Sequence, residues 1–269
     1  MGISFIIKNN LTVDTFSTRG ILSDNMFLDL TDRQIKLLEA IIKEYLETSE
    51  PVGSVTITKK YPINASAATV RNEMAELLDR GLLEMMHASS GRVPTPNAYK
   101  LFLQTMVFEE ELSVLQEVAI KQRLWAKRYE FEKMTRQAVL SLSEITHELG
   151  ILITDDGYIT HSGAVNLLDA TEFWDIETMK AALFLLDRHA DLFEIFRKNS
   201  YGGKEIMTAI GEDIGIENLR STAFVYAPYA CGTRTGYVGI FGPLRMRYET
   251  VIPAVRYTRN LIQELGENW

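Results

Sequence analysis

The chain has 269 residues, a formal net charge of −8 and 46% hydrophobic residues. This length and composition suffice for two domains with real cores, and the lack of any long apolar run argues against a membrane span. The single cysteine, Cys231, excludes an intramolecular disulfide and suits a reducing, cytoplasmic location. The acidic balance argues only weakly against nucleic-acid binding, because the acid lies mainly in runs such as the glutamates at 109–111.

Residues 1–28 contain neither a basic region nor a long apolar core, so they do not predict a signal peptide. We expect a disordered or misannotated extension, with Met26 as an alternative start.

Two helices are predicted next. Thr31 and Gln34 match a capping box, and apolar residues follow at helical spacing, which predicts a helix over 32–46. After a break around 49–53, Ser54 is expected to cap a short second helix that ends at Lys60.

A third helix is predicted between Ser66, a good N-cap, and Gly81, which suits a left-handed C-terminal cap. Its apolar stripe consists of Val70, Met74, Leu77 and Leu78. The opposite face carries Ala67, Ala68, Arg71 and Asn72. Small residues let a helix approach base edges, Arg pairs with guanine and Asn with adenine, so this face is typical of a recognition helix. An ordinary amphipathic helix is the alternative interpretation.

A hairpin is predicted after the third helix, with strands at 82–87 and 92–94 around a turn at 88–91. Three helices and a hairpin make a winged helix-turn-helix over residues 29–97. Across residues 51–72 the only charges are those of Lys59, Lys60 and Arg71, which form a basic stripe. The predicted DNA-binding residues are Ser54, Lys59, Lys60, Ser66, Ala67, Thr69, Arg71, Asn72, His87, Ser89, Ser90 and Arg92.

Residues 98–149 are expected to form a helical linker. Apolar residues recur along it, but their phase shifts near residue 130, which indicates either two amphipathic helices or one long helix that changes packing partner. Such a helix serves either as a dimer contact or as intramolecular packing against the second domain, and the pattern alone leaves both open.

Residues 150–269 are predicted to be an α+β domain, an antiparallel sheet with packed helices. Strands are expected at 150–154, 158–164, 206–211, 221–229 and 236–241. Residues 172–198 predict one helix or a broken pair, and 249–265 a closing helix. Arg245 and Arg247 follow the last strand, as a basic patch or as a structural ion pair.

Two blocks of sequence resemble the HrcA heat-inducible transcription repressors. Residues 29–99 resemble their winged-helix domain through PVGS at 51–54, ATVRNEMAEL at 68–77, GLL at 81–83 and HASSGRVPT at 87–95. The run GYVGIFGPLRMRYETVIPAV at 236–255 resembles their C-terminal signature.

That resemblance implies a repressor that binds an inverted-repeat operator upstream of chaperone genes as a homodimer, with the chaperonin as a partner. It also implies that residues 150–269 are a GAF-like regulatory domain. Typical members carry an inserted dimerisation domain, whereas here residues 141–159 run almost directly into the family segment at 162–175. We therefore expect a shortened member without that insert.

No catalytic residue, metal site or cofactor is predicted. The four histidines, at 87, 147, 161 and 189, are scattered, and neither a nucleophile elbow nor a phosphate loop is present in the sequence. Two alternative functions remain. One is a regulator whose GAF-like domain senses a small molecule, which requires an apolar pocket. The other is an interaction module without DNA binding, in which the rest of the chain covers the face with Ala67, Arg71 and Asn72.

Overall fold

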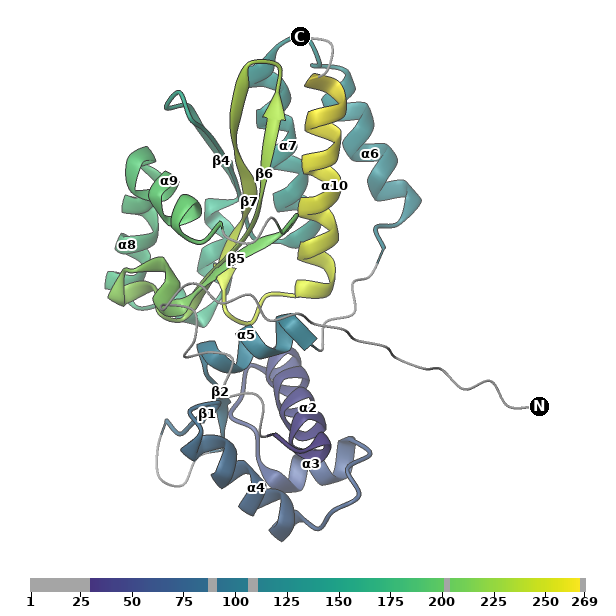
Figure 1. Ribbon diagram of the computed structural model, residues 1–269, viewed down its shortest axis with the longest axis vertical. Helices are drawn as coiled ribbons and strands as arrows, with labels where there is room; N and C mark the ends of the chain where they lie inside the picture. The colour runs from purple at the N-terminus through teal and green to yellow at the C-terminus, as the bar shows by residue number, and fades with distance from the viewer. Residues whose placement is uncertain (1–29, 87–90, 106–110, 201–203, 267–269) are drawn as a thin grey trace, which may run out of the picture.

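The computed structural model describes residues 30–86, 91–105, 111–200 and 204–266 (Figure 1). The predicted N-terminal extension at 1–28 and residues 88–90 of the predicted turn lie outside these ranges. A helical unit occupies one end of the molecule, and a five-stranded sheet with helices on both faces occupies the other. The predicted α+β fold class, with helices packed on an antiparallel sheet, is confirmed.

Three capped helices form the N-terminal unit: α2 (Asp32–Thr48), α3 (Ser54–Lys60) and α4 (Ala67–Asp79). The predicted capping box at Thr31 is present, since its hydroxyl accepts from the Gln34 N–H at 3.2 Å and the Gln34 carboxamide oxygen accepts from the Thr31 N–H at 3.0 Å. Gly81, with φ +69°, ends α4 as predicted, and the next N–H, of Leu82, donates to the Leu77 carbonyl at 2.9 Å. The prediction that Ser54 caps α3 is wrong, because Gly53 is the N-cap and Ser54 is the first helical residue.

A short hairpin of β1 (Leu83–Glu84) and β2 (Val93–Pro94) follows α4. Its base is joined to the α2–α3 connection by a backbone bridge between Val52 and Arg92, with N–H to O distances of 2.9 and 2.8 Å. Gly91 lies so close to this connection that an added Cβ would come within 2.5 Å of the Pro51 carbonyl. A side chain there would push the hairpin away from the helices.

The C-terminal sheet is antiparallel, in the order β4-β3-β7-β6-β5. Its strands are β3 (Leu149–Thr154), β4 (Ile159–Ser162), β5 (Met207–Ile210), β6 (Thr222–Cys231) and β7 (Arg234–Pro243). Alternate side chains enter two separate cores, so Leu152 and Val225 face one and Ile151 and Phe224 face the other. Both faces of the sheet are therefore filled by protein.

Helices cover the two faces of this sheet. On one face lie α7 (Phe131–Thr146) and α10 (Tyr248–Gly266), and on the other α8 (Ile176–Leu186) and α9 (His189–Lys198). Of the two predictions for residues 172–198, one helix or a broken pair, the structure has the broken pair. Four short 3₁₀ helices complete this part: η1 (Ala164–Asp169), η2 (Thr171–Phe173), η3 (Gly211–Ile214) and η4 (Glu217–Leu219).

The segment 98–149 begins within α5 (Pro96–Thr105) and continues as α6 (Val114–Trp125) and α7. The phase shift predicted near residue 130 corresponds to a break between Trp125 and Phe131, so of the two predicted alternatives the structure has the pair of helices. The apolar side of α7 is buried against the sheet, including Met134, Ala138 and Leu142. By contrast α6 buries Ile120 and Leu124 and leaves its other apolar side chains in solvent.

Candidate DNA-binding face and its support

Helix α4 lies at the end of the molecule farthest from the sheet, so nothing in the described structure covers its outer face (Figure 1). The Ser66 hydroxyl caps it by accepting from the Thr69 N–H at 3.1 Å, and lies 2.9 Å from the Thr69 hydroxyl. The first turn therefore presents amides and small side chains to solvent at the positive end of the helix dipole, where an anion is favoured.

Along α4 the exposed face changes character. Near the N-terminus it carries Arg71 and Asn72, both exposed, with Ala68 beside them. Toward the C-terminus the same face carries Asp79, also exposed, whose carboxylate would repel phosphate. The N-terminal half of the helix is thus the part suited to a polyanion.

Side-chain hydrogen bonds join the opposite side of α4 to α2. The Arg33 Nε donates to the Glu73 carboxylate at 2.5 Å, and the Gln34 amide donates to Glu76 at 2.6 Å. Glu73 itself is buried, which makes this a directional contact that fixes the rotation of α4. These supporting residues were not predicted, because their partners are forty residues away in the sequence.

The two lysines of the basic stripe have different roles. Lys59 is exposed at the end of α3. The Lys60 ammonium lies 2.9 Å from both carboxylate oxygens of the buried Glu44, to which Tyr61 also donates at 3.2 Å. The hydrogen bonds that Lys60 donates to Glu44 raise the pKa of Lys60 and stabilise its charged form. This ion pair was not predicted. Its signal in the sequence is Glu44, an acidic residue three positions after Ile41 on the apolar side of α2.

The remaining predicted residues are distributed as follows. Ser54 is buried, so its side chain cannot reach DNA and we remove it from the face. Ala67, Thr69 and Arg92 are half-buried. His87, Ser89 and Ser90 lie outside the described residues.

The junction between the two units is aromatic and charged. Tyr99 of α5 packs on Tyr248 of α10, with ring centroids 6.2 Å apart, and both rings are fully buried. Lys100 pairs with Asp213 at 2.7 Å. Burial at this junction anchors the helical unit on the sheet unit.

Arg245 forms an ion pair with Glu172 at 2.8 Å, and both side chains are largely buried. The structural alternative for Arg245 is therefore the one observed. Nearby, burial raises the pKa of Glu148 to about 8, Arg245 opposes this shift, and Glu172 adds to it. A Cβ added at Gly242 would collide with a Glu148 carboxylate oxygen, so the Glu148 side chain would have to shift.

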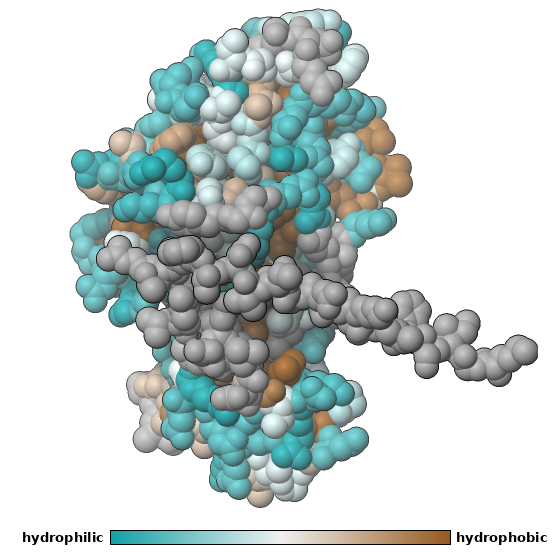
Figure 2. All heavy atoms as spheres, viewed as in Figure 1, coloured by the Kyte–Doolittle hydropathy of each residue, from teal (hydrophilic) through white to brown (hydrophobic). Residues whose placement is uncertain are grey.

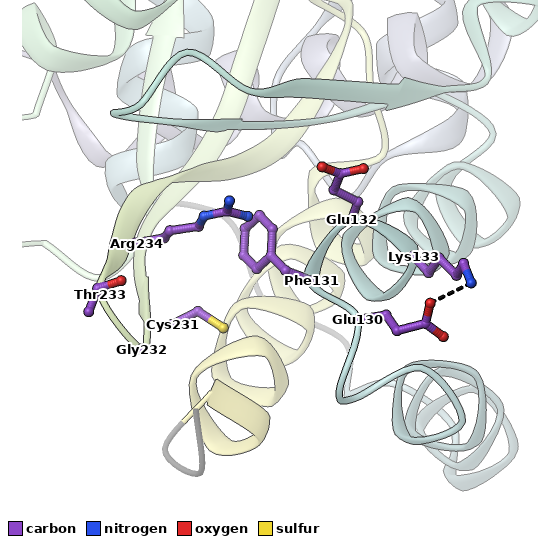
Figure 3. A pocket seen from close by; sticks show the side chains of 8 residues that line it. All are labelled: Glu130, Phe131, Glu132, Lys133, Cys231, Gly232, Thr233 and Arg234. Atoms are coloured by element: carbon purple, nitrogen blue, oxygen red, sulfur yellow. Dashed lines mark ion pairs between the residues drawn. The ribbon is translucent and has the colours of Figure 1, made fainter.

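An open hollow of about 520 Å³ lies between the start of α7 and the β6–β7 turn (Figure 3). Four charged side chains line it: Glu130, Glu132, Lys133 and Arg234. The Arg234 guanidinium stacks 4.4 Å from the centroid of Phe131, and Glu130 pairs with Lys133. Burial raises the pKa of the Cys231 thiol, and Arg234 opposes this shift. This is a charged surface hollow, unlike the apolar enclosure that a small-molecule sensor needs.

Within the described residues no helix is both long and apolar enough to cross a bilayer.

Comparison with solved structures supports the fold. One crystal structure, described as that of a hypothetical protein at 2.2 Å resolution, matches with a TM-score of 0.71 at 18% identity. The match covers 89% of this chain and 99% of that one.

Sequence relatives are heat-inducible transcription repressors named HrcA. The protein of Clostridium tetani is 36% identical over 149 residues, which cover 55% of this chain and 42% of that repressor. The protein of Pelotomaculum thermopropionicum is 26% identical over 341 residues, which cover 88% of this chain and 97% of its own length. Because that alignment is longer than the 269 residues of this chain, the chain is a shortened form, as expected.

The family model for the HrcA protein C terminal domain matches residues 97–252. This match spans more than half of the sequence, and the chain belongs to the HrcA family.

Proposed function

We propose that the chain is a DNA-binding transcriptional repressor whose residues 29–97 form a winged helix-turn-helix. The observation that carries this proposal is the exposed N-terminal half of α4, with Arg71 and Asn72 in solvent beside small residues. An interaction module that had lost DNA binding would cover this face, and in the described structure it is uncovered. The names of the relatives, heat-inducible transcription repressors, agree with this reading.

In this proposal α4 enters the major groove by its N-terminus. Arg71 and Asn72 read base edges, while Lys59, Ser66 and Thr69 hold phosphates on either side. Lys60 adds to the local positive potential, but its ammonium also neutralises Glu44. Arg92 lies at the base of the wing, and His87, Ser89 and Ser90 at its tip would contact the backbone.

The target, by family resemblance, is an inverted-repeat operator of heat-shock (chaperone) genes, bound by a homodimer. We assign residues 150–269, together with the helix α7 that packs on their sheet, to a GAF-like regulatory domain. The sheet cores are filled and apolar residues are exposed on α8, which favours a protein partner such as the chaperonin over a metabolite.

The test is a selection of bound duplexes from a pool of random DNA by the full chain, followed by binding at several salt concentrations. We expect enrichment of an inverted repeat and an affinity that falls steeply with salt. Enrichment of no sequence, or binding without salt dependence, would refute the repressor proposal.

A further inference from the structure

Helix α6 leaves an apolar stripe exposed on the outside of the sheet unit. The stripe consists of Leu115, Val118, Gln122 and Trp125, and Tyr129 continues it in the turn that follows the helix. Val114 lies at its edge. Exposed fractions of 83% for Leu115, 74% for Tyr129 and 49% for Trp125 are high for side chains of this size. Figure 2 shows apolar surface gathered over α6.

Within α6 the spacing of this stripe is three, four and three residues, the repeat of a helix that packs along another helix. Tyr129 follows four residues after Trp125, in the turn beyond the end of the helix. The inner side of α6 already has its partners, since Ile120 and Leu124 are buried and the Tyr257 hydroxyl donates to the Glu117 carbonyl at 3.1 Å. The stripe is therefore a second, outward seam.

We propose that this seam binds α6 of a second copy of the chain in antiparallel orientation, with the twofold axis near Gln122. The inference rests on the proposed function in one respect, because an inverted repeat needs two recognition helices. A polar residue at the centre of an apolar seam is a known device for fixing register, and here Gln122 of each copy would meet the other.

The antiparallel register matches the two ends of the seam. It brings Tyr129 of the second copy to Leu115, beside a hollow of about 190 Å³ between α6 and α7. Leu115, Ala119 and Ile145 line that hollow, so an aromatic ring has an apolar place to enter. The Arg128 guanidinium lies 4.3 Å from the ring centroids of both Trp125 and Tyr129, and this Trp, Tyr and Arg composition is enriched in protein interfaces.

Charge favours this orientation over the parallel one. Around Gln122, the antiparallel arrangement places Glu117 at the level of Arg128 of the second copy, and neither side chain has an ion pair within the described residues. A parallel arrangement would instead place Arg128 beside Arg128 of the second copy. Like charges at that distance repel.

The area agrees with a concentration-dependent dimer. The stripe exposes roughly 500 Å² of apolar surface per copy, given the 150–250 Å² of a large aromatic side chain. A standard interface buries about 800 Å² per partner. We therefore expect a dimer that DNA with two half-sites would stabilise further.

The test is the oligomeric state of the full chain without DNA, by analytical ultracentrifugation across a wide concentration range. Wild type should dimerise, and Leu115→Glu and Trp125→Glu should each raise the dissociation constant by at least about tenfold, since they bury a charge in the seam. The matched control is Ile176→Glu on the exposed apolar surface of α8, which should leave the dimer intact. Circular dichroism checks that all variants remain folded.

A charge-swap experiment tests the register. Glu117→Arg and Arg128→Glu should each weaken the dimer, and a mixture of the two single variants should restore it, because each copy then offers the complementary charge. The inference is overturned if wild type is monomeric throughout, if the α6 variants dimerise normally, or if Ile176→Glu dissociates the dimer. Since no DNA is present, these outcomes leave the repressor proposal standing or falling on its own test.

Discussion

The helical unit and the sheet unit each leave one helix face exposed, and the two faces have opposite chemistry. On α4 the exposed N-terminal half is small, polar and cationic. On α6 the exposed stripe is apolar and aromatic. Exposure alone therefore does not identify a binding face; the side chains on it show whether a polyanion or another protein surface is complementary.

The junction between the units gives the largest expected effect. Because the folded pKa of Glu148 is about 8, above its ordinary value of 4.5, its contribution to stability is full below pH 4.5 and is lost progressively as the pH rises from 4.5 to about 8. Glu148→Gln should remove this loss. We expect the wild type, relative to the variant, to lose about 2–4 kcal/mol between pH 5 and pH 9, as measured by urea unfolding. Parallel pH profiles for the two proteins would contradict a buried, neutral Glu148.

The base of the β1–β2 hairpin gives the next largest effect. Gly91→Ala should lower the free energy of unfolding by about 1–3 kcal/mol, because its Cβ would collide with the Pro51 carbonyl. Gly81→Ala is the matched control, with open space but a φ of +69°, and should cost about 1 kcal/mol. Equal losses for both variants would show that the hairpin does not rest on the α2–α3 connection.

Arg71→Ala tests whether the α4 face binds DNA independently of dimerisation through α6. It should cost about 1–3 kcal/mol in binding to the selected duplex and relax selectivity at one base position. The dissociation constant of the dimer should not change, since Arg71 lies on α4. Fluorescence anisotropy and ultracentrifugation measure the two quantities, and a change in dimerisation would break the separation proposed here.

Ser66 distinguishes helix capping from phosphate contact. Ser66→Ala should destabilise the protein by about 1 kcal/mol through loss of the bond to the Thr69 N–H. Ser66→Asp should retain the cap, because Asp also accepts from that amide, but should weaken DNA binding by placing a carboxylate beside phosphate. If the Asp variant bound DNA as tightly as wild type, the start of α4 would not contact phosphate.

Lys59 and Lys60 give the smallest effects. Lys59→Ala should leave the melting temperature unchanged and reduce the salt slope of DNA binding by about one. Lys60→Ala should lower the melting temperature as well, because Glu44 loses its partner. If both variants melted alike, the ion pair with Glu44 would have no structural role.

Local features were the most predictable from sequence. The capping box at Thr31, the cap at Ser66 and the positive φ at Gly81 depend on neighbours within a few residues. The antiparallel sheet was also predicted, because its strands are short apolar runs that are separated by turn-forming residues.

Long-range pairings were not predictable. Glu44 meets Lys60 only when α2 packs on α3, and Arg245 reaches Glu172 across 73 residues. The stripes of α6 and α7 look alike in the sequence, yet one is buried and the other exposed. Periodicity shows that a helix has an apolar side, but it does not show which part of the protein, if any, covers that side.

The most direct test of the central claim is a salt titration of the wild type and Arg71→Ala on the selected duplex and on a duplex with one half-site. If α4 reads the operator, wild type should bind the full repeat more tightly than the half-site, with a steeper salt dependence, and Arg71→Ala should lose sequence preference on both. Equal binding to selected and scrambled duplexes by both proteins would contradict this role of α4.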